Sequence, residues 1–283
     1  MVNLPSALSD RLPDRMTGHH GPVVTVVRLH GVIASGAAGL GRSQLNTDSV
    51  EGPLERAFTA DGVQAVALSV NSPGGSPTQS ALIGDRIRQL AAEHEVPVLA
   101  FCEDVAASGG CWLACAADEI FAAPTSLLGS VGVVSSGFGL EGLIGKLGVE
   151  RRLHTQGVNK SRLDPFSPEK TADVDWLLAI QASIHTEFAT WVRSRRPGLV
   201  GTDDELFTGE VWTGRRAVEL GLADGLGTLR GVLAERYPDA DVRPTARKTS
   251  LAARLGLPGA AASVAGSVVA AVEDRAAWAR FGL

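Results

Sequence analysis

Residues 102–134, "CEDVAASGGCWLACAADEIFAAPTSLLGSVGVV", decide how this chain folds. They lead from an apolar strand through the turn Ala-Ala-Ser-Gly-Gly into a helix of small residues, and then into the apolar run 119–124. A strand, a helix and a second strand in this order are typical of parallel strands joined by right-handed crossovers. Ser108 lies in the turn. It is either the N-cap of the helix or a nucleophile, and the choice depends on which group could take its proton.

The same alternation continues outward from this stretch in both directions. The helix over 76–95 carries apolar residues at Ala81, Ile83, Ile87 and Leu90, which is the spacing of an amphipathic helix. The other predicted elements are strands within 22–35, 63–75 and 96–106, helices within 50–62, 108–118 and 169–195, and a turn with two helices within 209–237. The sequence therefore predicts an α/β fold with a parallel sheet.

Composition narrows the class of protein. The chain has 283 residues, of which 45% are hydrophobic and 20% are charged, as in a soluble globular protein of one large domain or one domain with an appendage. A net charge of −5 argues against a nucleic-acid partner, which usually selects a basic face. Cys102, Cys111 and Cys115 suit neither a disulfide framework nor a zinc site, so we expect buried free thiols in a reducing compartment.

The two ends differ from the middle. Residues 1–22 hold no apolar run long enough for a signal peptide or a membrane anchor, and we expect a flexible arm there. Residues 241–283 are predicted to be an alanine-rich helical tail, which could pack on the domain, mediate assembly or lie on a membrane surface. We therefore expect a cytoplasmic protein, and a peripheral contact at the inner face of the membrane stays open.

Two glycine turns end predicted parallel strands, "NSPGGS" at 71–76 and "AASGG" at 106–110. Ligands of open parallel sheets bind at the carboxyl ends of the strands, where both turns lie. Glycine allows positive φ and close approach of another group. Taken singly, each turn is also compatible with a purely structural role, and Ala106 departs from the first glycine of a G-x-S-x-G elbow.

A nucleophilic serine needs a base. No histidine follows Ser108 within 108–134, although a triad that includes His154 stays open because triads are defined in space. A lysine can serve instead where burial disfavours its charged form. Lys160, in "HTQGVNKSRLDPFSP" at 154–168, is the candidate, but taken alone it is more typical of a solvated loop lysine.

The order of the motifs is more specific than any one of them. The chain resembles the S49 peptidases, the signal peptide peptidase A and SohB-like family, in the order and spacing of three motifs: "NSPGGS", the 102–134 stretch and "GVNKSRLDPFSP". The chain resembles that family from about Val23 to Tyr237.

The resemblance implies a ClpP/crotonase-type fold of repeated β-β-α and βαβ units, with a parallel sheet and a helical C-terminal part, over a peptidase domain at 23–240. It implies Ser108 as nucleophile and Lys160 as general base. The backbone N–H groups of Gly75 and Ser108 would form the oxyanion hole, and Ser130 would orient the lysine amine. It implies neither a metal nor a cofactor.

The resemblance also implies a function. The chain would be a serine endopeptidase that cleaves peptides or unfolded or membrane-derived polypeptides, as a homo-oligomer in which Lys160 completes the neighbour's site. Typical members carry an N-terminal membrane anchor, which puts signal peptides as substrates in doubt here. Two rivals remain: a crotonase-like acyl-CoA enzyme, whose acids would be Glu103, Asp104 or Glu119, and a non-catalytic scaffold.

Overall fold

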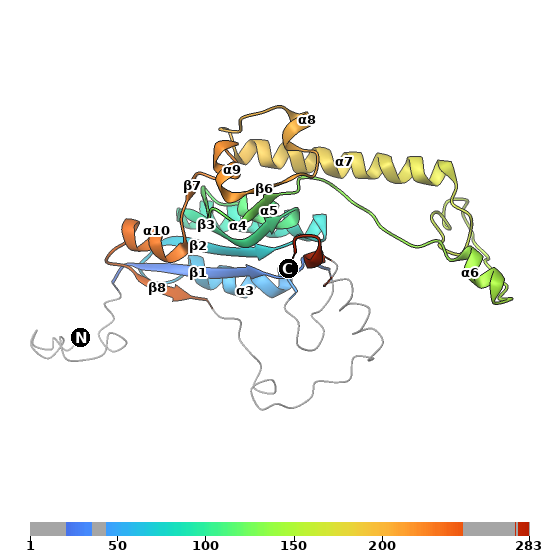
Figure 1. Cartoon of the computed structure of the whole chain (residues 1–283). Helices are drawn as coiled ribbons and strands as arrows, with labels where there is room; N and C mark the ends of the chain where they lie inside the picture. Colours follow the sequence, from blue (N-terminus) through green and yellow to red (C-terminus); the bar gives the residue numbers. More distant parts are fainter. Residues whose placement is uncertain (1–20, 36–43, 246–274, 276, 283) are drawn as a thin grey trace, which may run out of the picture. The chain divides into compact units, whose positions relative to one another are not determined.

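The computed structural model describes residues 21–35, 44–245, 275 and 277–282 (Figure 1). The chain forms two compact units, the first made of Met1–Val131 and Trp191–Leu283 and the second of Gly132–Thr190. Most of the expected arm at 1–22 and of the expected tail at 241–283 lies outside the described residues.

One eight-stranded sheet forms the centre of the first unit. Its strands follow the order β6-β5-β3-β2-β1-β8, with β4 pairing β3 and β7. All pairs are parallel except β5 with β6. The strands are β1 (Val23–His30), β2 (Val63–Ser72), β3 (Val98–Ala107), β4 (Glu119–Ala122), β5 (Leu127–Gly129), β6 (Val211–Thr213), β7 (Gly225–Leu226) and β8 (Asp241–Pro244). The expected domain boundary at residue 240 falls just before β8.

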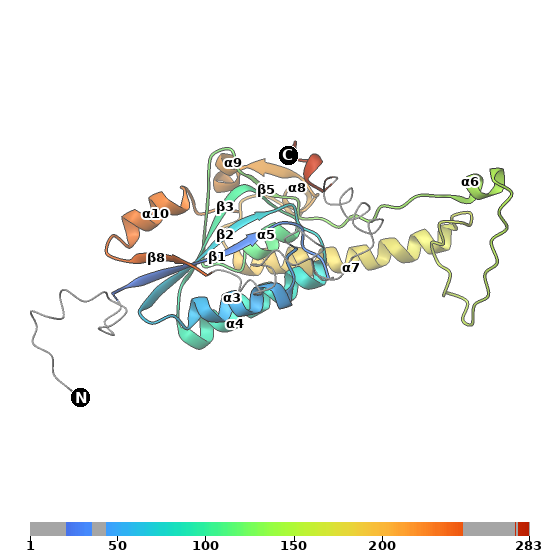
Figure 2. The same cartoon turned by 90° about the horizontal axis from the view of Figure 1, so that it is seen from below.

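Both faces of the sheet are covered, which is why its strands read as continuous apolar runs. Thr25 of β1 donates to the carbonyl of Ala57 in α3 (3.1 Å), whereas its neighbours Val24 and Val26 pack with Val232 and Leu233 of α10. Figure 2 shows α3 and α4 on one side of the sheet and α10 on the other. The helices of this unit are α3 (Thr47–Phe58), α4 (Pro77–His94), α5 (Gly109–Ala114), α8 (Asp203–Leu206), α9 (Gly214–Glu219) and α10 (Leu229–Arg236).

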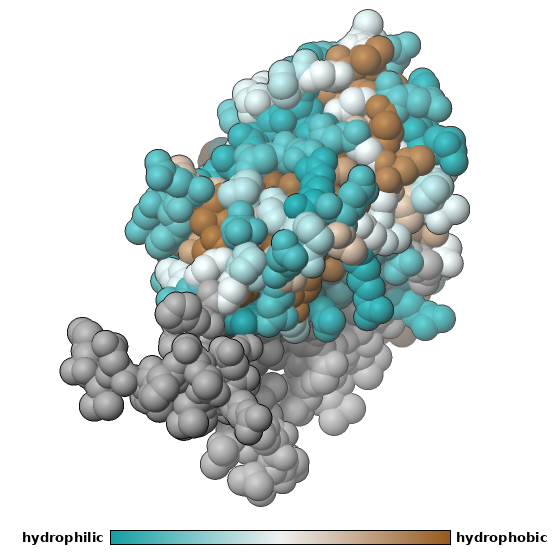
Figure 3. Space-filling view, turned by 90° about the vertical axis from the view of Figure 1, so that its left-hand side faces the viewer, coloured by the Kyte–Doolittle hydropathy of each residue, from teal (hydrophilic) through white to brown (hydrophobic). Residues whose placement is uncertain are grey.

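The outer surface around α10 is mostly hydrophilic, with smaller apolar areas between (Figure 3). Arg236 of α10 makes a two-pronged ion pair with Glu119 there, with one N–O distance of 2.8 Å, and its guanidinium lies over the ring of Phe121. Ligands of open parallel sheets bind at the carboxyl ends of the strands, so the functional site is expected there rather than at α10.

The parallel register brings the two glycine turns to one edge of the sheet. Ser72, near the end of β2, pairs with Ala106, near the end of β3, after an irregularity in the ladder. Ser76 then caps α4, accepting a hydrogen bond from the N–H of Gln79, as the Ser-Pro-Thr start predicts.

The second unit contains α6 (Glu141–Lys146) and most of α7 (Thr171–Arg195), whose residues from Trp191 onward belong to the first unit. Neither unit, as far as its residues are described, has a helix long and apolar enough to cross a membrane.

Candidate active site

Ser108 occupies the turn between β3 and α5 in an unusual backbone conformation. Its φ is 53° and its ψ is −123°, a region that residues with a side chain rarely adopt. Its side chain makes no capping hydrogen bond to the helix. The N-cap interpretation therefore loses its support, because a strained backbone without a capping contact is typical of a functional position rather than of a helix start. A sharp strand-to-helix turn of this kind displays a nucleophilic serine in α/β hydrolases.

The first glycine turn packs directly against Ser108. Gly74 has φ of 100° and Gly75 of 142°. A side chain added at Gly74 would come within 2.7 Å of the Ser108 Cβ and 2.8 Å of the Gly109 nitrogen, and one at Gly75 would collide with the carbonyl oxygen of Ile33. Only glycine fits both positions, so the two sequence motifs that lie far apart in the chain form one structure.

One part of the expected oxyanion hole is wrong. The N–H of Ser108 donates to the carbonyl of Gly129 (2.8 Å), continuing the pairing of β3 with β5, and cannot also bind an oxyanion. The next N–H, of Gly109, stands at the first helical position, where a helix offers no acceptor. Within the described residues neither this N–H nor that of Gly75 makes a backbone hydrogen bond. These two donors are the pair that the turn leaves open.

Ser130 follows β5 and therefore lies beside the end of β3. It is 8% exposed, its φ is 53°, and its N–H donates to the carbonyl of Glu210 (2.6 Å). Its hydroxyl accepts a hydrogen bond from the guanidinium of Arg280 (3.2 Å), a contact that the sequence did not predict. Partial burial lowers the pKa of Arg280.

The three cysteines lie behind the turn as free, buried thiols, as expected. The hydrogen bond between Cys111 and Cys115 lowers the pKa of Cys111 and raises that of Cys115, and burial raises the pKa of Cys102. Thiols without access to solvent are inert packing groups rather than nucleophiles. No group of three or more His, Cys, Asp or Glu side chains in the described part of the chain could hold a metal ion.

The structure also brings together a second serine, a histidine and an acid, a cluster that the sequence did not predict. Ser69 on β2 lies 2.7 Å from the Nε2 of His30 on β1, and its hydroxyl donates to Glu103 on β3 (2.5 Å). The adjacent strands bring the three together, although they lie far apart in the chain. This cluster is not a catalytic triad, because Ser69 is 2% exposed and its hydroxyl donates its hydrogen bond to the carboxylate of Glu103 rather than to the histidine.

The acids that a crotonase-like enzyme would need are engaged elsewhere. Glu103 accepts from Ser69, Asp104 accepts from the amide of Asn71 (2.8 Å), and Glu119 pairs with Arg236. None of them faces the glycine turns as an open acid or base, so the structure gives this rival no support.

Lys160 and His154 belong to the second unit. Both are exposed in the single chain, and the N–H of Lys160 donates to the carbonyl of Gly157 (3.2 Å) in a turn where Gly157 has φ of 103°. The structure thus brings Ser108, Gly75 and Ser130 together in one unit, while the approach of Lys160 to Ser108 stays a prediction.

Comparison with known families decides between the remaining classes. The sequence profile of peptidase family S49 matches residues 91–243, which is more than half of the chain. The chain belongs to peptidase family S49. The match covers Ser108, Ser130 and Lys160 and ends within β8.

Relatives of this S49 chain carry two kinds of name. A Brucella abortus protein named Na⁺/H⁺ antiporter NhaA is 45% identical over 293 residues, which cover 99% of this chain and 39% of that protein. Protease 4 of Salmonella typhi is 31% identical over 218 residues, covering 76% of this chain and 34% of that protein. The chain therefore spans less than half the length of either relative.

Solved structures confirm the expected ClpP-like α/β fold. Two mutants of the 1510-N membrane-bound stomatin-specific protease match with TM-scores of 0.51 and 0.50 at 17% and 18% identity. The matches cover 81% and 84% of this chain and 100% and 97% of theirs. At this identity the likeness concerns the fold alone.

Proposed function

We propose that this chain is a serine peptidase in which Ser108 is acylated by the substrate. The proposal rests on the turn itself. Ser108 has positive φ and no capping bond and is held against the Gly74–Gly75 turn, and in the described residues the N–H groups of Gly75 and Gly109 make no backbone hydrogen bond. This arrangement presents a hydroxyl and two donors at one point, which is what acyl transfer requires.

In the proposed reaction the Oγ of Ser108 attacks the carbonyl carbon of a peptide bond while its proton passes to the neutral amine of Lys160. The N–H groups of Gly75 and Gly109 stabilise the oxyanion of the tetrahedral intermediate. The intermediate then collapses, and the departing amine takes the proton from Lys160. Water, activated by the same amine, releases the acyl group from Ser108 and completes hydrolysis.

Lys160 is the proposed base because it completes the motif order of family S49. One of the two related-fold structures is a serine-to-alanine mutant, and the other is a lysine-to-alanine mutant in complex with a substrate peptide. For this chain the same pair of residue types, Ser108 and Lys160, is the proposal. The hydroxyl of Ser130 would aim the lysine amine.

A lysine acts as a base only when it is sheltered from water, because burial disfavours its charged form. Lys160 is exposed in the single chain, so the proposed mechanism needs a covering surface. We propose that a second copy of the chain supplies it and that the sites are shared between subunits. Large exposed apolar side chains in the second unit support assembly; they include Val134, Phe138, Leu147, Val149 and Val158.

The proposed substrates are peptides or unfolded polypeptides. The protease names of the relatives support peptide hydrolysis. The antiporter name of the Brucella protein describes a molecule more than twice as long as the matched part, so it is not carried over to this chain.

Cleavage of a fluorogenic peptide and of unfolded casein tests the reaction. The wild-type protein should cleave both. Ser108→Ala and Lys160→Ala should each lose at least about 10³-fold in turnover, because the nucleophile and its base act as one unit. A Ser108→Ala protein that keeps wild-type turnover would show that another group does the chemistry.

Mixing the two inactive variants tests the shared site. If one subunit's lysine serves another's serine, co-assembly of Ser108→Ala with Lys160→Ala restores a fraction of the activity. If the mixture stays inactive although mass spectrometry of the intact complex shows mixed oligomers, each site is built within one chain.

A further inference from the structure

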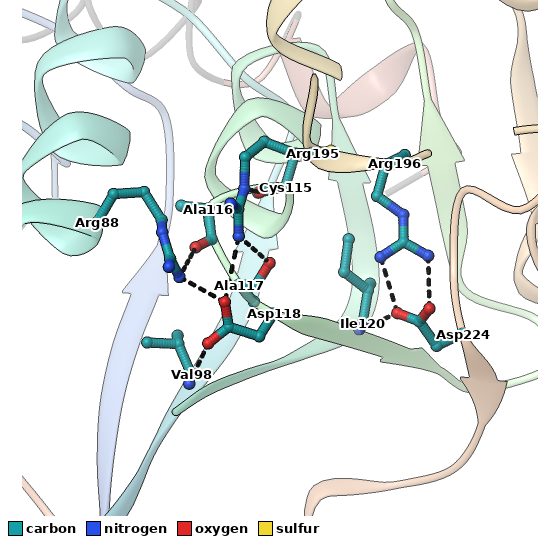
Figure 4. Close-up of polar contacts among 10 residues, drawn as sticks. All are labelled: Arg88, Val98, Cys115, Ala116, Ala117, Asp118, Ile120, Arg195, Arg196 and Asp224. Carbon is teal, nitrogen blue, oxygen red and sulfur yellow. Dashed lines mark hydrogen bonds and ion pairs between the residues drawn. The ribbon is translucent and has the colours of Figure 1, made fainter. Parts of the chain in front are cut away.

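The other end of the nucleophile-bearing helix is held by side chains from two other helices (Figure 4). The last carbonyl groups of a helix have no partner within it. In the turn that directly follows α5, the carbonyls of Cys115 and Ala117 accept hydrogen bonds from Arg195 at 3.0 Å each, and that of Ala116 accepts one from Arg88 at 3.2 Å. The C-terminal end of α5 is thus tied to α4 and to the last residue of α7.

The same arginines bind a carboxylate that reaches the start of β3. Asp118 accepts from Arg88 (2.7 Å) and Arg195 (3.3 Å), and its other oxygen accepts from the N–H of Val98 (2.9 Å). Since β3 begins at Val98 and α5 follows it, these bonds join the start of the strand to the end of the helix. Ser108 lies at the opposite end of this strand–turn–helix unit, in the turn between the two elements.

Close packing around α5 should make a shift of its C-terminal end move the turn at Ser108 as well. All six residues of α5 are buried. The rings of Trp112 in α5 and Trp191 in α7 are stacked with centroids 5.9 Å apart, and the indole N–H of Trp191 donates to the carbonyl of Trp112 (3.1 Å). A side chain at Gly84 of α4 would come within 3.2 Å of Trp112. A buried, close-packed helix of under two turns moves as one piece.

The turn at Ser108 needs such support. A non-glycine residue at φ of 53° costs free energy and keeps this conformation only where its surroundings impose it. The glycine turn and the Ser108 N–H bond to Gly129 impose it from one side. The hydrogen bonds of Arg195 and Arg88 hold the other end of this strand–turn–helix segment, where α5 ends and β3 begins.

We propose that Arg195 is a positioning residue for the Ser108 hydroxyl: it holds the C-terminal end of α5 to the start of β3, so that the turn between them keeps the hydroxyl in place for attack on a carbonyl whose oxygen is bound by the oxyanion donors. The inference rests on the proposed function of Ser108. An arginine suits this role because its planar fork binds two carbonyls and a carboxylate at once, which a lysine ammonium on a flexible stem does less well.

The test compares Arg195→Ala with two variants of the same helix end. Arg195→Lys keeps the charge without the fork. Arg193→Ala is the matched control, since Arg193 pairs with Asp203 and lies over the ring of Phe207, and no hydrogen bond or ion pair among the described residues joins it to α5. Turnover and KM for a fluorogenic peptide are measured on folded protein, well below the melting temperature of each variant.

Arg195→Ala should lower kcat at least tenfold while KM and the pH profile stay close to wild type, because the base and the substrate contacts are unchanged. Arg195→Lys should recover part of the loss, and Arg193→Ala should behave as wild type. If Arg195→Ala only lowers the melting temperature and keeps kcat at a temperature where it is folded, Arg195 is merely structural and the inference fails.

A second readout does not depend on activity. Cys111 and Cys115 lie in and just after α5 and are buried, so their alkylation by iodoacetamide under native conditions reports opening of this helix. Arg195→Ala should accelerate alkylation of these thiols at least tenfold over wild type and Arg193→Ala. Unchanged alkylation would overturn the inference even if the peptide assay fails, whereas a wild-type protein without peptidase activity would count against the proposed function alone.

Discussion

At the scale of single residues, two serines at the candidate site have backbones held at positive φ. Ser108 and Ser130 both have φ of 53°, and they follow the paired ends of β3 and β5. The motif order alone singles out both residues. Their conformation, and the engagement of the Ser108 N–H with Gly129, follow from strand pairing that no local pattern in the sequence encodes.

Relieving the strain at residue 108 should stabilise the protein while abolishing catalysis. Ser108→Gly removes the side chain and permits φ of 53° and ψ of −123°, so it should be more stable than Ser108→Ala by about 1–3 kcal/mol. Urea unfolding of the two inactive variants measures the difference. Equal unfolding free energies would mean that the turn carries no strain.

His30 makes stability depend on pH. Burial lowers the pKa of His30 below its ordinary 6.5, with Arg28 lowering it further and Glu103 and Asp104 opposing the shift. Below pH 6.5 the unfolded chain therefore binds more protons than the folded one, and the unfolding free energy falls as the pH drops through 6.5 toward the lower folded pKa.

His30→Gln should flatten this dependence. The loss of unfolding free energy between about pH 7.5 and pH 5.5, measured by urea unfolding, should be smaller in His30→Gln than in the wild-type protein. The exposed His154, changed to Gln, serves as the control and should leave the dependence as it is. A steeper fall in His30→Gln would reverse the sign argued here.

At the scale of elements, the sequence predicts the long apolar strands and the long amphipathic helix. The runs that became β1, β2 and β3, and the amphipathic pattern that became α4, lie where periodicity and capping residues predict them. The strands β5, β6, β7 and β8 have two to four residues each, too few for any periodicity, and pairing within the sheet rather than a local pattern defines them. The hydrogen bonds from α7 to the end of α5 could not be predicted either. They join a side chain to carbonyls about 80 residues away, and no local pattern encodes such a contact.

An ion pair between the buried Arg196 and the partly exposed Asp224 links the end of α7 to β7, and it should be sensitive to loss of the carboxylate. Arg196, 6% exposed, binds both oxygens of Asp224 at 2.8 Å, and Asp224 also accepts from the N–H of Ile120 (2.7 Å). Asp224→Asn leaves the buried guanidinium without its counter-charge. It should lower the unfolding free energy by about 2–4 kcal/mol.

The matched control is an exposed pair on α9. Glu219→Gln removes the carboxylate that faces Arg216, and both side chains are more than half exposed. Its effect should stay within about 0.5 kcal/mol. Similar losses in Asp224→Asn and Glu219→Gln would show that burial does not govern these pairs.

At the scale of the whole molecule, the proposed base and nucleophile lie in different units, and the unit that holds the base exposes much apolar surface. Phe138 is 85% exposed and Val158, two residues before Lys160, is 96% exposed. Such side chains are costly in water unless another surface covers them. Assembly would cover them and shelter the lysine in one step.

Charging this surface should separate the subunits. The double variant Phe138→Asp and Val158→Asp should elute as a smaller species in size-exclusion chromatography with light scattering and should lose peptidase activity, because Lys160 loses its shelter. Leu82→Asp, at a 47% exposed apolar position of the first unit, is the control for added charge and should keep the oligomer. A double variant that stays assembled and active would show that this apolar surface is not needed for assembly or for catalysis.

Acylation of Ser108 by the substrate is the step on which the proposed peptidase activity depends, and it can be observed by trapping the adduct. The protein is incubated with an activated peptide ester, quenched with acid, and analysed by intact mass and by mapping of the modified residue. We expect one acyl group per chain on Ser108 and none in Ser108→Ala. An adduct that forms on another residue, or that forms equally in Ser108→Ala, would contradict it.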